Sequence, residues 1–273
     1  MRTTVPIPVI AALALALGAC GASEPGGGSA TTATAKPAAV DPQRAVVSVL
    51  GIYADKKTQV TGVVFEAGQG LVLTANHAVE AAPKIDVRLA DGSLTHGRAV
   101  ARAQCHDLAV IKLNPRPPGL VALPLGQSSK ASVGQPVTTL TYLLPSTSAG
   151  KLAFTRVQGT ISAVGVKEAF PPLPPTGPFL AHQTQLLAPA SGSPIVDARG
   201  RMLGFNTLAG HAREPDLPGI EYALTSDYIR QRLRELRPGT GGALGGWESE
   251  HDACHATLRK LVGLGHGHDP KKP

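Results

Sequence analysis

Short apolar runs separated by turn residues make up most of the chain between residues 44 and 225. Runs rich in Val, Ile, Leu and Thr, bounded by Gly, Pro, Asn, Asp or Ser, are typical of β-strands. The predicted strands are residues 45–53, 60–65, 71–74, 85–89, 98–103 and 108–113, then 137–142, 156–164, 184–187, 194–197, 202–207 and 220–224. A Pro-rich joint at residues 115–118 separates the two sets. Two sets of about six short strands predict two β-barrels or a β-sandwich.

Helical periodicity follows the last predicted strand, at residues 227–237. Ile229, Leu233 and Leu236 lie on one face of this helix, with a capping hydroxyl before it and a proline after it. A Gly-rich break then separates it from a second predicted helix at residues 248–262. The pattern therefore predicts a β-rich domain that ends in a helix.

The N-terminal segment is typical of a targeting signal rather than of folded structure. Arg2 precedes an apolar run at residues 5–17, which is too short to remain as a membrane span. The run ends in LGAC, which resembles the lipobox of bacterial lipoproteins, in which Cys20 would receive the lipid. An ordinary secretory signal cleaved near the same place is the alternative. The lipobox favours an exported chain anchored by lipid to the outer face of the bacterial cytoplasmic membrane.

These patterns divide the chain into four parts. They are a signal peptide at residues 1–19, the lipidated cysteine and a flexible tether at 20–43, a folded domain at 44–237, and a Gly- and His-rich tail at 238–273. The tether is inferred from its Gly, Ser, Thr, Ala and Pro content without periodicity. Within the folded domain we expect barrel one at about 44–118, barrel two at about 119–225 and the helix at 226–237.

The composition adds charge to this picture. A net charge of +7 is compatible with nucleic acid or an anionic membrane surface as a partner. However, the Lys and Arg residues are scattered, and aromatic residues make up only 4% of the sequence, too few for base stacking. We therefore interpret the charge as a solvated basic surface and expect no nucleic-acid partner.

Three segments contain the residue types that nucleophilic catalysis needs. LVLTANHAV leads from a predicted strand to His77, HDLAVIKL places Asp107 just before a strand, and SGSPIV places Ser191 in a small-residue turn. A serine hydroxyl becomes a nucleophile when a base accepts its proton, and a buried carboxylate orients that base. Each residue alone indicates little, because such residues are common in turns. The ordered set of three predicts acyl transfer.

With these flanks, the chain resembles the chymotrypsin-like serine proteases, and among them the bacterial HtrA-like proteases. TANHAV is similar to the family's segment around the catalytic histidine, DLAVIKL to its DLAVLKI segment, and SGSPIV to its SGGP or SGSP turn. The resemblance covers about residues 44–237 and implies two six-stranded Greek-key β-barrels with a C-terminal helix. It also implies a serine endopeptidase that cleaves exported or envelope polypeptides, with His77 as base, Asp107 as its orienting acid and Ser191 as nucleophile. No cofactor is implied, and the stretch after residue 237 is too short for the PDZ domain of many HtrA relatives.

The nucleophile turn departs from the family pattern. The family has a glycine two residues before the serine, and its N–H joins that of the serine in the oxyanion hole. Here that position is Pro189, which has no N–H, and Ala190 replaces the usual Asn or Asp. Two readings stay open. One is a slow protease whose oxyanion loop is Pro189, Ala190 and Ser191, and the other is a catalytically impaired pseudoprotease that binds peptides or proteins in the envelope.

The same resemblance places the primary specificity pocket. Gln185, six residues before the nucleophile, lines this pocket in the family alignment, and Asn206 and Thr207 of the GFNT segment belong to it as well. Because Gln185 carries no charge, cleavage after Arg or Lys is not expected. Small or medium apolar residues before the cut are the preferred substrates in this interpretation.

The remaining cysteines and the tail leave further alternatives. Cys105 and Cys254 form a candidate disulfide if the chain is exported. His251 and His255 are one helical turn apart in the second predicted helix, which raises the alternative of a metal-handling lipoprotein with the barrels as scaffold. No carboxylate or thiol cluster completes a site there, so we expect no metal.

Overall fold

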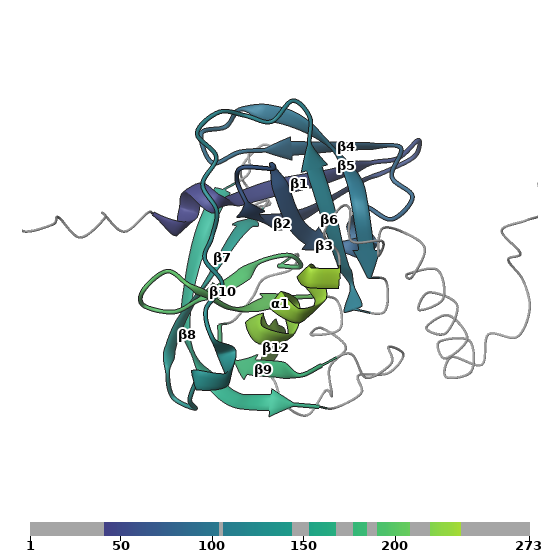
Figure 1. Ribbon diagram of the computed structural model, residues 1–273. Coiled ribbons are helices and arrows are strands. Elements are labelled where there is room, and N and C mark those ends of the chain that lie inside the picture. The colour runs from purple at the N-terminus through teal and green to yellow at the C-terminus, as the bar shows by residue number, and fades with distance from the viewer. Residues whose placement is uncertain are drawn as a thin grey trace, which may run out of the picture. The chain divides into compact units, whose positions relative to one another are not determined.

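The computed structural model describes residues 41–103, 106–143, 153–167, 177–184, 190–207 and 219–235, all within one compact unit of the chain, Ala39–Pro273. Several predictions fall outside these ranges: the signal, Cys20, most of the tether, Cys105, Gln185, Pro189, the helix at 248–262, Cys254 and the His residues of the tail. A short 3₁₀ helix, Pro42–Ala45, precedes the first strand. Figure 1 shows the arrangement of the strands that follow it.

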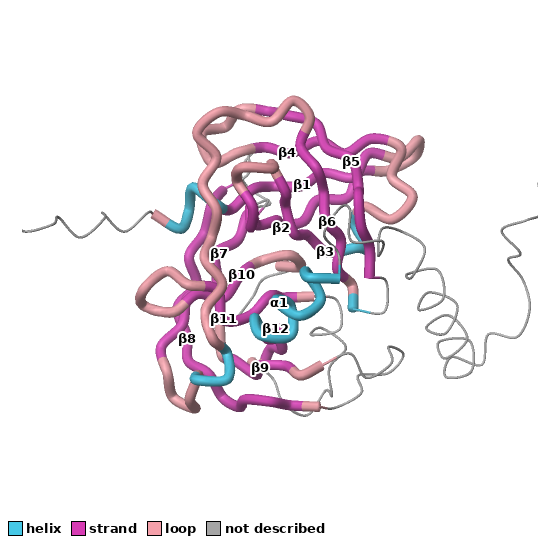
Figure 2. The backbone as a smooth tube through the Cα atoms, in the orientation of Figure 1, coloured by secondary structure: helices cyan, strands magenta, loops and turns pink. Residues whose placement is uncertain are grey.

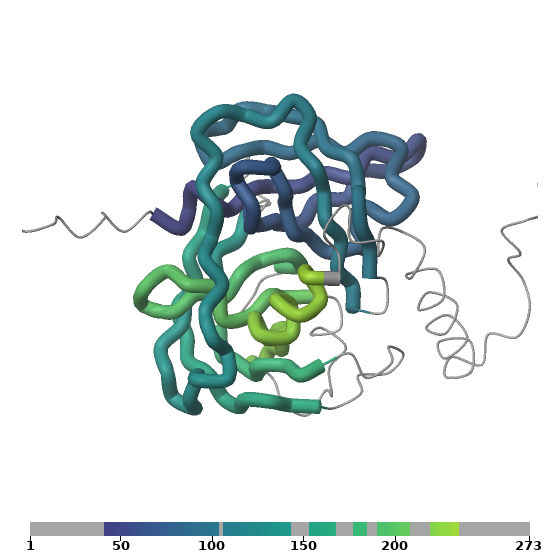
Figure 3. Tube along the Cα trace, in the orientation of Figure 1, coloured from purple at the N-terminus to yellow at the C-terminus, as the bar shows by residue number. Residues whose placement is uncertain are grey.

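Barrel one is a closed sheet of antiparallel strands in the order β1-β2-β3-β6-β5-β4. Its strands are β1 (Val46–Ile52), β2 (Lys57–Glu66), β3 (Leu71–Ala75), β4 (Lys84–Arg88), β5 (Leu94–Ala103) and β6 (Leu108–Leu113). Figure 3 shows that this barrel takes up the first half of the described chain, drawn from purple to teal. A segment that includes the 3₁₀ helix Ser128–Lys130 connects it to the second barrel.

Barrel two closes in the order β10-β11-β12-β9-β8-β7. Its strands are β7 (Pro136–Leu143), β8 (Ala153–Val166), β9 (Phe179–His182), β10 (Pro194–Val196), β11 (Met202–Asn206) and β12 (Glu221–Thr225), and helix α1 (Ser226–Glu235) follows directly. Figure 2 distinguishes the strands of both barrels from this helix by colour. Two closed barrels exclude the β-sandwich, so the predicted pair of six-stranded barrels with a C-terminal helix is confirmed.

Alternation along the strands explains how the barrels pack against each other. In β3, Val72 joins Ile111 of β6 in an apolar cluster formed by barrel-one residues. Its neighbour Leu73 belongs to a second cluster that includes Leu140 and Phe205 of barrel two. Successive side chains of a strand point to opposite faces. Both faces of β3 are therefore covered, and the end of β3 lies where the two barrels meet.

One strand of barrel two, β9, was not predicted from the sequence. The sequence pattern places a strand at residues 184–187, whereas β9 is Phe179–His182, all four residues of which are buried. β9 pairs with β12 on one side and with β8 on the other. Thr184 lies beyond the strand, and 185–187 fall outside the described residues. Pairing with β8 and β12, which the local pattern does not contain, defines this strand.

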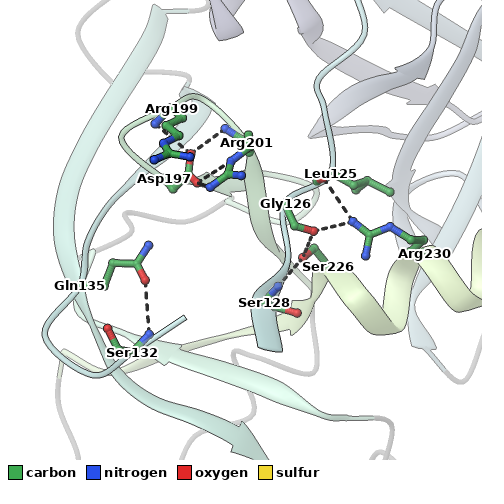
Figure 4. Close-up of polar contacts among 10 residues, drawn as sticks. All are labelled: Leu125, Gly126, Ser128, Ser132, Gln135, Asp197, Arg199, Arg201, Ser226 and Arg230. Carbon is green, nitrogen blue, oxygen red and sulfur yellow. Dashed lines mark hydrogen bonds and ion pairs between the residues drawn. The ribbon is translucent and has the colours of Figure 1, made fainter. Parts of the chain in front are cut away.

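Polar contacts hold the start of helix α1 against the segment that connects the two barrels, as Figure 4 shows. The Ser226 hydroxyl donates to the Gly126 carbonyl at 3.1 Å and accepts from the Ser128 N–H at 3.2 Å. The Arg230 guanidinium donates to the carbonyls of Leu125 and Gly126. Of the predicted apolar face of the helix, Ile229 and Leu233 are buried in the cluster that the two barrels share, and Leu236 lies outside the described residues.

Asp227, in the first turn of α1, has a pKa below its usual range. Burial raises this pKa, but hydrogen bonds from the Ser129 N–H at 2.8 Å, the Ser128 hydroxyl at 3.1 Å and Arg230 outweigh that effect. The carboxylate thereby joins the helix to the 3₁₀ turn of the connecting segment. Charge on Asp227 is therefore linked to the stability of this junction.

Replacing Asp227 by asparagine is expected to lower the free energy of unfolding by less than about 1 kcal/mol at neutral pH, because solvent screens this partly exposed carboxylate near the helix N-terminus. A depressed folded-state pKa stabilises the protein above the ordinary carboxylate pKa, and this contribution disappears as the pH falls through the depressed value. Urea unfolding at neutral and acid pH measures the effect, with the exposed Asp55→Asn as an inert control. An equal loss at both pH values would contradict the role of the charge.

Candidate active site

Strand pairing brings the predicted base and acid together. β3 and β6 are antiparallel, and Ala75 at the end of β3 faces Leu108 at the start of β6. His77 lies two residues after Ala75, in the 3₁₀ helix Asn76–Ala78, and Asp107 lies one residue before Leu108. The backbone also joins the two segments, because the Asn76 N–H donates to the Asp107 carbonyl at 3.1 Å.

His77 and Asp107 form a close pair. Nδ1 of His77 lies 2.9 Å from Oδ2 and 3.0 Å from Oδ1 of Asp107, and the His77 N–H donates to Oδ1 at 2.8 Å. The Asp107 side chain is 8% exposed, whereas that of His77 is 34% exposed. A buried carboxylate beside Nδ1 favours the tautomer with its proton on Nδ1, which leaves Nε2 as the basic nitrogen.

The pKa of His77 lies above its ordinary value. Burial of the ring lowers this pKa, but the hydrogen bond to Asp107 and the charges of Asp107 and Glu80 raise it by more. These groups favour the imidazolium form, which is the form a histidine takes after accepting a proton from a nucleophile. The environment of His77 is therefore suited to a base rather than to a buried structural histidine.

Asp107 has an unusual backbone conformation, with φ of +52°. A non-glycine residue rarely adopts the left-handed region, although Asp does so more readily than most. This conformation turns the chain just before β6, where the Asp107 carboxylate contacts both the ring and the backbone N–H of His77. Backbone strain of this kind is concentrated at functional sites.

Ser191 lies in a tight turn that leads into β10. Gly192 has φ of +83°, and a Cβ there would lie 1.7 Å from the Thr61 carbonyl oxygen, so only glycine fits. The Gly192 N–H donates to the Asn206 carbonyl at 2.8 Å, and the Ser193 N–H donates to the Ala190 carbonyl at 3.1 Å. Within the described residues, the Ser191 N–H makes no hydrogen bond.

Thr61 of β2 connects the turn of Ser191 to the strand that leads to His77. Its N–H donates to the Ser191 carbonyl at 3.0 Å, and its carbonyl accepts from the Thr74 hydroxyl of β3 at 2.9 Å. The structure therefore brings all three predicted residues to the junction of the barrels. In the described part of the chain, no hydrogen bond joins the Ser191 hydroxyl to His77. Such a bond is often loose until substrate is present.

The two described residues of the predicted specificity pocket are both buried. Oδ1 of Asn206 lies 3.0 Å from Nε2 of His182, and its Nδ2 donates to the Ser193 carbonyl at 3.2 Å. The Thr207 side chain is also buried, and its hydroxyl has no partner among the described residues. The amide of Asn206 is thus used to support the nucleophile turn.

Sequence reasoning missed both His182 and Thr61. His182 is fully buried and also lies 2.8 Å from the Thr184 hydroxyl through Nδ1. In the sequence, His182 and Thr61 stand out only as polar residues beside apolar ones. This pattern does not predict which groups their side chains contact. Ala190, of the predicted oxyanion loop, is buried beside Ser191, whereas Pro189 and Gln185 fall outside the described residues.

The described residues contain no group of three or more His, Cys, Asp or Glu side chains that would hold a metal ion. In the same part of the chain, no helix has the length and apolar character needed to cross a membrane.

Comparison with known proteins agrees with this geometry. A family model described as a trypsin-like peptidase domain matches residues 60–205, which include His77, Asp107 and Ser191. The serine protease Do-like HtrA of Bacillus subtilis (strain 168) is 29% identical over 181 residues, which are 64% of this chain and 38% of that protein. The periplasmic serine endoprotease DegP of Escherichia coli (strain K12) is 27% identical over 180 residues, 64% of this chain and 35% of that protein.

A solved structure, the HtrA-type protease AlgW with tripeptide, has a TM-score of 0.59 and 26% identity over 71% of this chain and 60% of that one. The chain thus spans less than half the length of the two relatives named above. The match to the family model covers more than half of this sequence, and the two barrels are those of the matched structures. The chain therefore belongs to the family of trypsin-like peptidase domains.

Proposed function

We propose that the chain is a serine endopeptidase that hydrolyses peptide bonds of exported or cell-envelope polypeptides through His77, Asp107 and Ser191. The contact of Asp107 with Nδ1 of His77, at 2.9 Å, is the observation that carries this proposal. A buried acid that orients an accessible imidazole is what a hydroxyl nucleophile requires. The serine proteases and endoproteases among the relatives support the same reaction class.

The reaction follows from the roles of the three groups. The Ser191 hydroxyl oxygen attacks the carbonyl carbon of the substrate while its proton passes to Nε2 of His77. His77 then gives this proton to the leaving amine as the C–N bond breaks, and an acyl-enzyme remains. Water attacks the acyl group by the same route, releasing the acid and restoring the serine. Asp107 stays ionised and stabilises the imidazolium in each step.

The oxyanion of each tetrahedral intermediate needs donors. The Ser191 N–H, which makes no hydrogen bond to the described residues, is the first donor in this proposal. Pro189 occupies the position of the second donor and has no N–H to give. Loss of one oxyanion donor costs a factor of about 10²–10³ in kcat. We therefore propose a slow endopeptidase.

Replacing Pro189 by glycine is expected to raise the rate of casein hydrolysis by about 10²-fold, because it restores a backbone donor. The full-length protein, Pro189→Gly and Pro189→Ala are compared, since alanine also restores the N–H without the freedom of glycine. Increased rates in both variants support the missing donor. A rate that falls in both variants would show that Pro189 is part of the working site.

The alternative function is a pseudoprotease that keeps the fold and binds envelope peptides or proteins without cutting them. The specific observation that favours it is the proline at the oxyanion position. It predicts no casein hydrolysis by the natural chain and peptide binding that does not change in Ser191→Ala. Activity that appears only in Pro189→Gly would assign the chain to this class.

For substrate preference we propose small or medium apolar residues before the scissile bond, with Gln185, Asn206 and Thr207 at the pocket. The commitment of the Asn206 amide to His182 and Ser193 supports a pocket in which this side chain shapes the wall and does not bind a charged substrate group. No acidic residue among the three attracts Arg or Lys.

For the setting of the reaction, we propose export to the cell envelope and attachment by lipid at Cys20 to the outer face of the cytoplasmic membrane. The periplasmic relatives support export, and the LGAC sequence supports the lipid. A disulfide between Cys105 and Cys254 fits the same oxidising compartment.

A further inference from the structure

Thr61 of β2 is fully buried and uses every polar group it has. β2 and β3 pair only from Gly62 onward, so the backbone of Thr61 lies just past the end of that ladder. Its N–H and carbonyl on that side are thus not taken by a neighbouring strand. A buried backbone group without a strand partner needs another one. The N–H, the carbonyl and the hydroxyl of Thr61 each bond to a different part of the site.

The backbone of Thr61 contacts two elements of the proposed catalytic machinery. Its N–H donates to the carbonyl of Ser191, the nucleophile residue itself, at 3.0 Å. Its carbonyl accepts from the hydroxyl of Thr74 at 2.9 Å, three residues before His77. Gly192 approaches the same carbonyl so closely that no side chain fits between them. The nucleophile turn thus lies directly on Thr61.

The side chain of Thr61 reaches barrel two. Its hydroxyl lies 3.2 Å from the Thr141 hydroxyl and accepts from the Tyr142 N–H at 3.1 Å, both on β7. β10 pairs with β7 only at Thr138 and Thr139, so the Tyr142 N–H lies beyond that ladder. The Thr61 hydroxyl therefore supplies the acceptor that β7 lacks at the junction of the barrels.

We propose that Thr61 is a positioning residue that sets the distance between Ser191 and His77 by tying the nucleophile turn, β3 and β7 to one point. The inference rests on the proposed function, because it concerns the same site. Ser191 belongs to barrel two and His77 to barrel one, so their separation depends on how the barrels are held together. The hydrogen bonds of Thr61 go to Ser191, Thr74 and β7, so it acts through the backbone of Ser191.

The test compares rates of labelling by a fluorophosphonate in the full-length protein. Thr61→Val keeps the shape and backbone of Thr61 but removes the hydroxyl, leaving the Tyr142 N–H and Thr141 hydroxyl without their partner. A displacement of catalytic groups by about 1 Å costs roughly 10²-fold in rate, so we expect labelling of Ser191 to slow by about 10- to 100-fold. Thr61→Ser keeps the hydroxyl and is expected to label at nearly the natural rate.

A matched control separates positioning from stability. Thr95 is a buried threonine of barrel one whose hydroxyl donates to the Pro115 carbonyl at 2.9 Å. Thr95→Val is expected to lower the melting temperature like Thr61→Val and to leave labelling unchanged. The pH at half-maximal labelling is expected to stay the same in Thr61→Val, because the pair of His77 and Asp107 is intact. Labelling of Thr61→Val at the natural rate would overturn the proposal, as would equal slowing in Thr95→Val.

Two further measurements cover the remaining outcomes. If Thr61→Val fails to fold, Thr141→Val removes the other hydroxyl of the contact and is expected to slow labelling in the same way. If the natural chain is not labelled at all, the proposed function has failed, and hydrogen exchange of residues 190–193 decides the inference. Faster exchange there in Thr61→Val but not in Thr95→Val supports the positioning role, and unchanged exchange overturns it.

Discussion

Ser191→Ala is expected to reduce peptide-bond hydrolysis by on the order of 10⁶-fold, as removal of the nucleophile does in subtilisin. The methyl group of alanine cannot attack a carbonyl carbon, and no covalent acyl-enzyme can form. The same loss is expected in the Pro189→Gly background, where the rate before substitution is higher and the drop is easier to measure. Initial rates of casein or peptide hydrolysis, with the pure variants at high concentration, give the ratio.

Ser193 provides the matched control for this substitution. It lies two residues further along the same turn, it is fully buried, and its hydroxyl has no partner among the described residues. Ser193→Ala keeps the backbone bonds that the Ser193 carbonyl accepts from Asn206 and is expected to retain most of the activity. Activity that survives in Ser191→Ala, or is lost equally in both variants, would remove Ser191 from the nucleophile position.

Asp107→Asn has the second largest expected effect, a drop of about 10⁴-fold in kcat. The amide would favour the wrong tautomer of His77, and it carries no charge that could stabilise the imidazolium. It also changes the pH dependence. Hydrolysis requires neutral His77, so the rate rises with pH through the pKa of this residue. Asp107 raises that pKa, and burial lowers it. The variant's profile is therefore expected to shift to lower pH, as measured by kcat over the acid and neutral range.

A second His-Asp pair in barrel one serves as the control. Nδ1 of His96 lies 2.7 Å from Oδ1 of Asp86, and the two residues face each other across β4 and β5. Asp86→Asn breaks a contact of the same kind away from Ser191 and is expected to leave kcat and its pH profile unchanged. If Asp86→Asn and Asp107→Asn had the same effect, the loss would reflect stability and not the orientation of His77.

The strand pattern predicted two sets of about six strands and left barrels or a β-sandwich open, and the resemblance to the chymotrypsin-like proteases implied the two barrels that the structure shows. β3 and β6 were placed within a residue of their observed limits, and this placement alone brings His77 beside Asp107. β9 was not predicted at Phe179–His182, because this strand is defined by pairing with β8 and β12. Pairing of this kind joins residues far apart in the chain and is not visible in local composition.

The contacts that refine the site were also beyond the reach of the pattern. The left-handed conformation of Asp107 has no signal in HDLAVIKL, since most Asp residues before strands are extended. In the sequence, Thr61 is one polar residue in a predicted apolar strand. Its hydroxyl contacts β7 only because the two barrels pack against each other. The sequence therefore predicted candidate groups, and the structure added the contacts that hold them.

The central claim is that Ser191 is an activated nucleophile, and covalent labelling tests it most directly. The full-length protein is treated with a fluorophosphonate, digested and mapped by mass spectrometry, beside Ser191→Ala and Pro189→Gly. We expect a single adduct on Ser191 in the natural chain, faster labelling in Pro189→Gly and none in Ser191→Ala. An adduct on another serine would contradict an activated Ser191. So would the absence of an adduct in both the natural chain and Pro189→Gly.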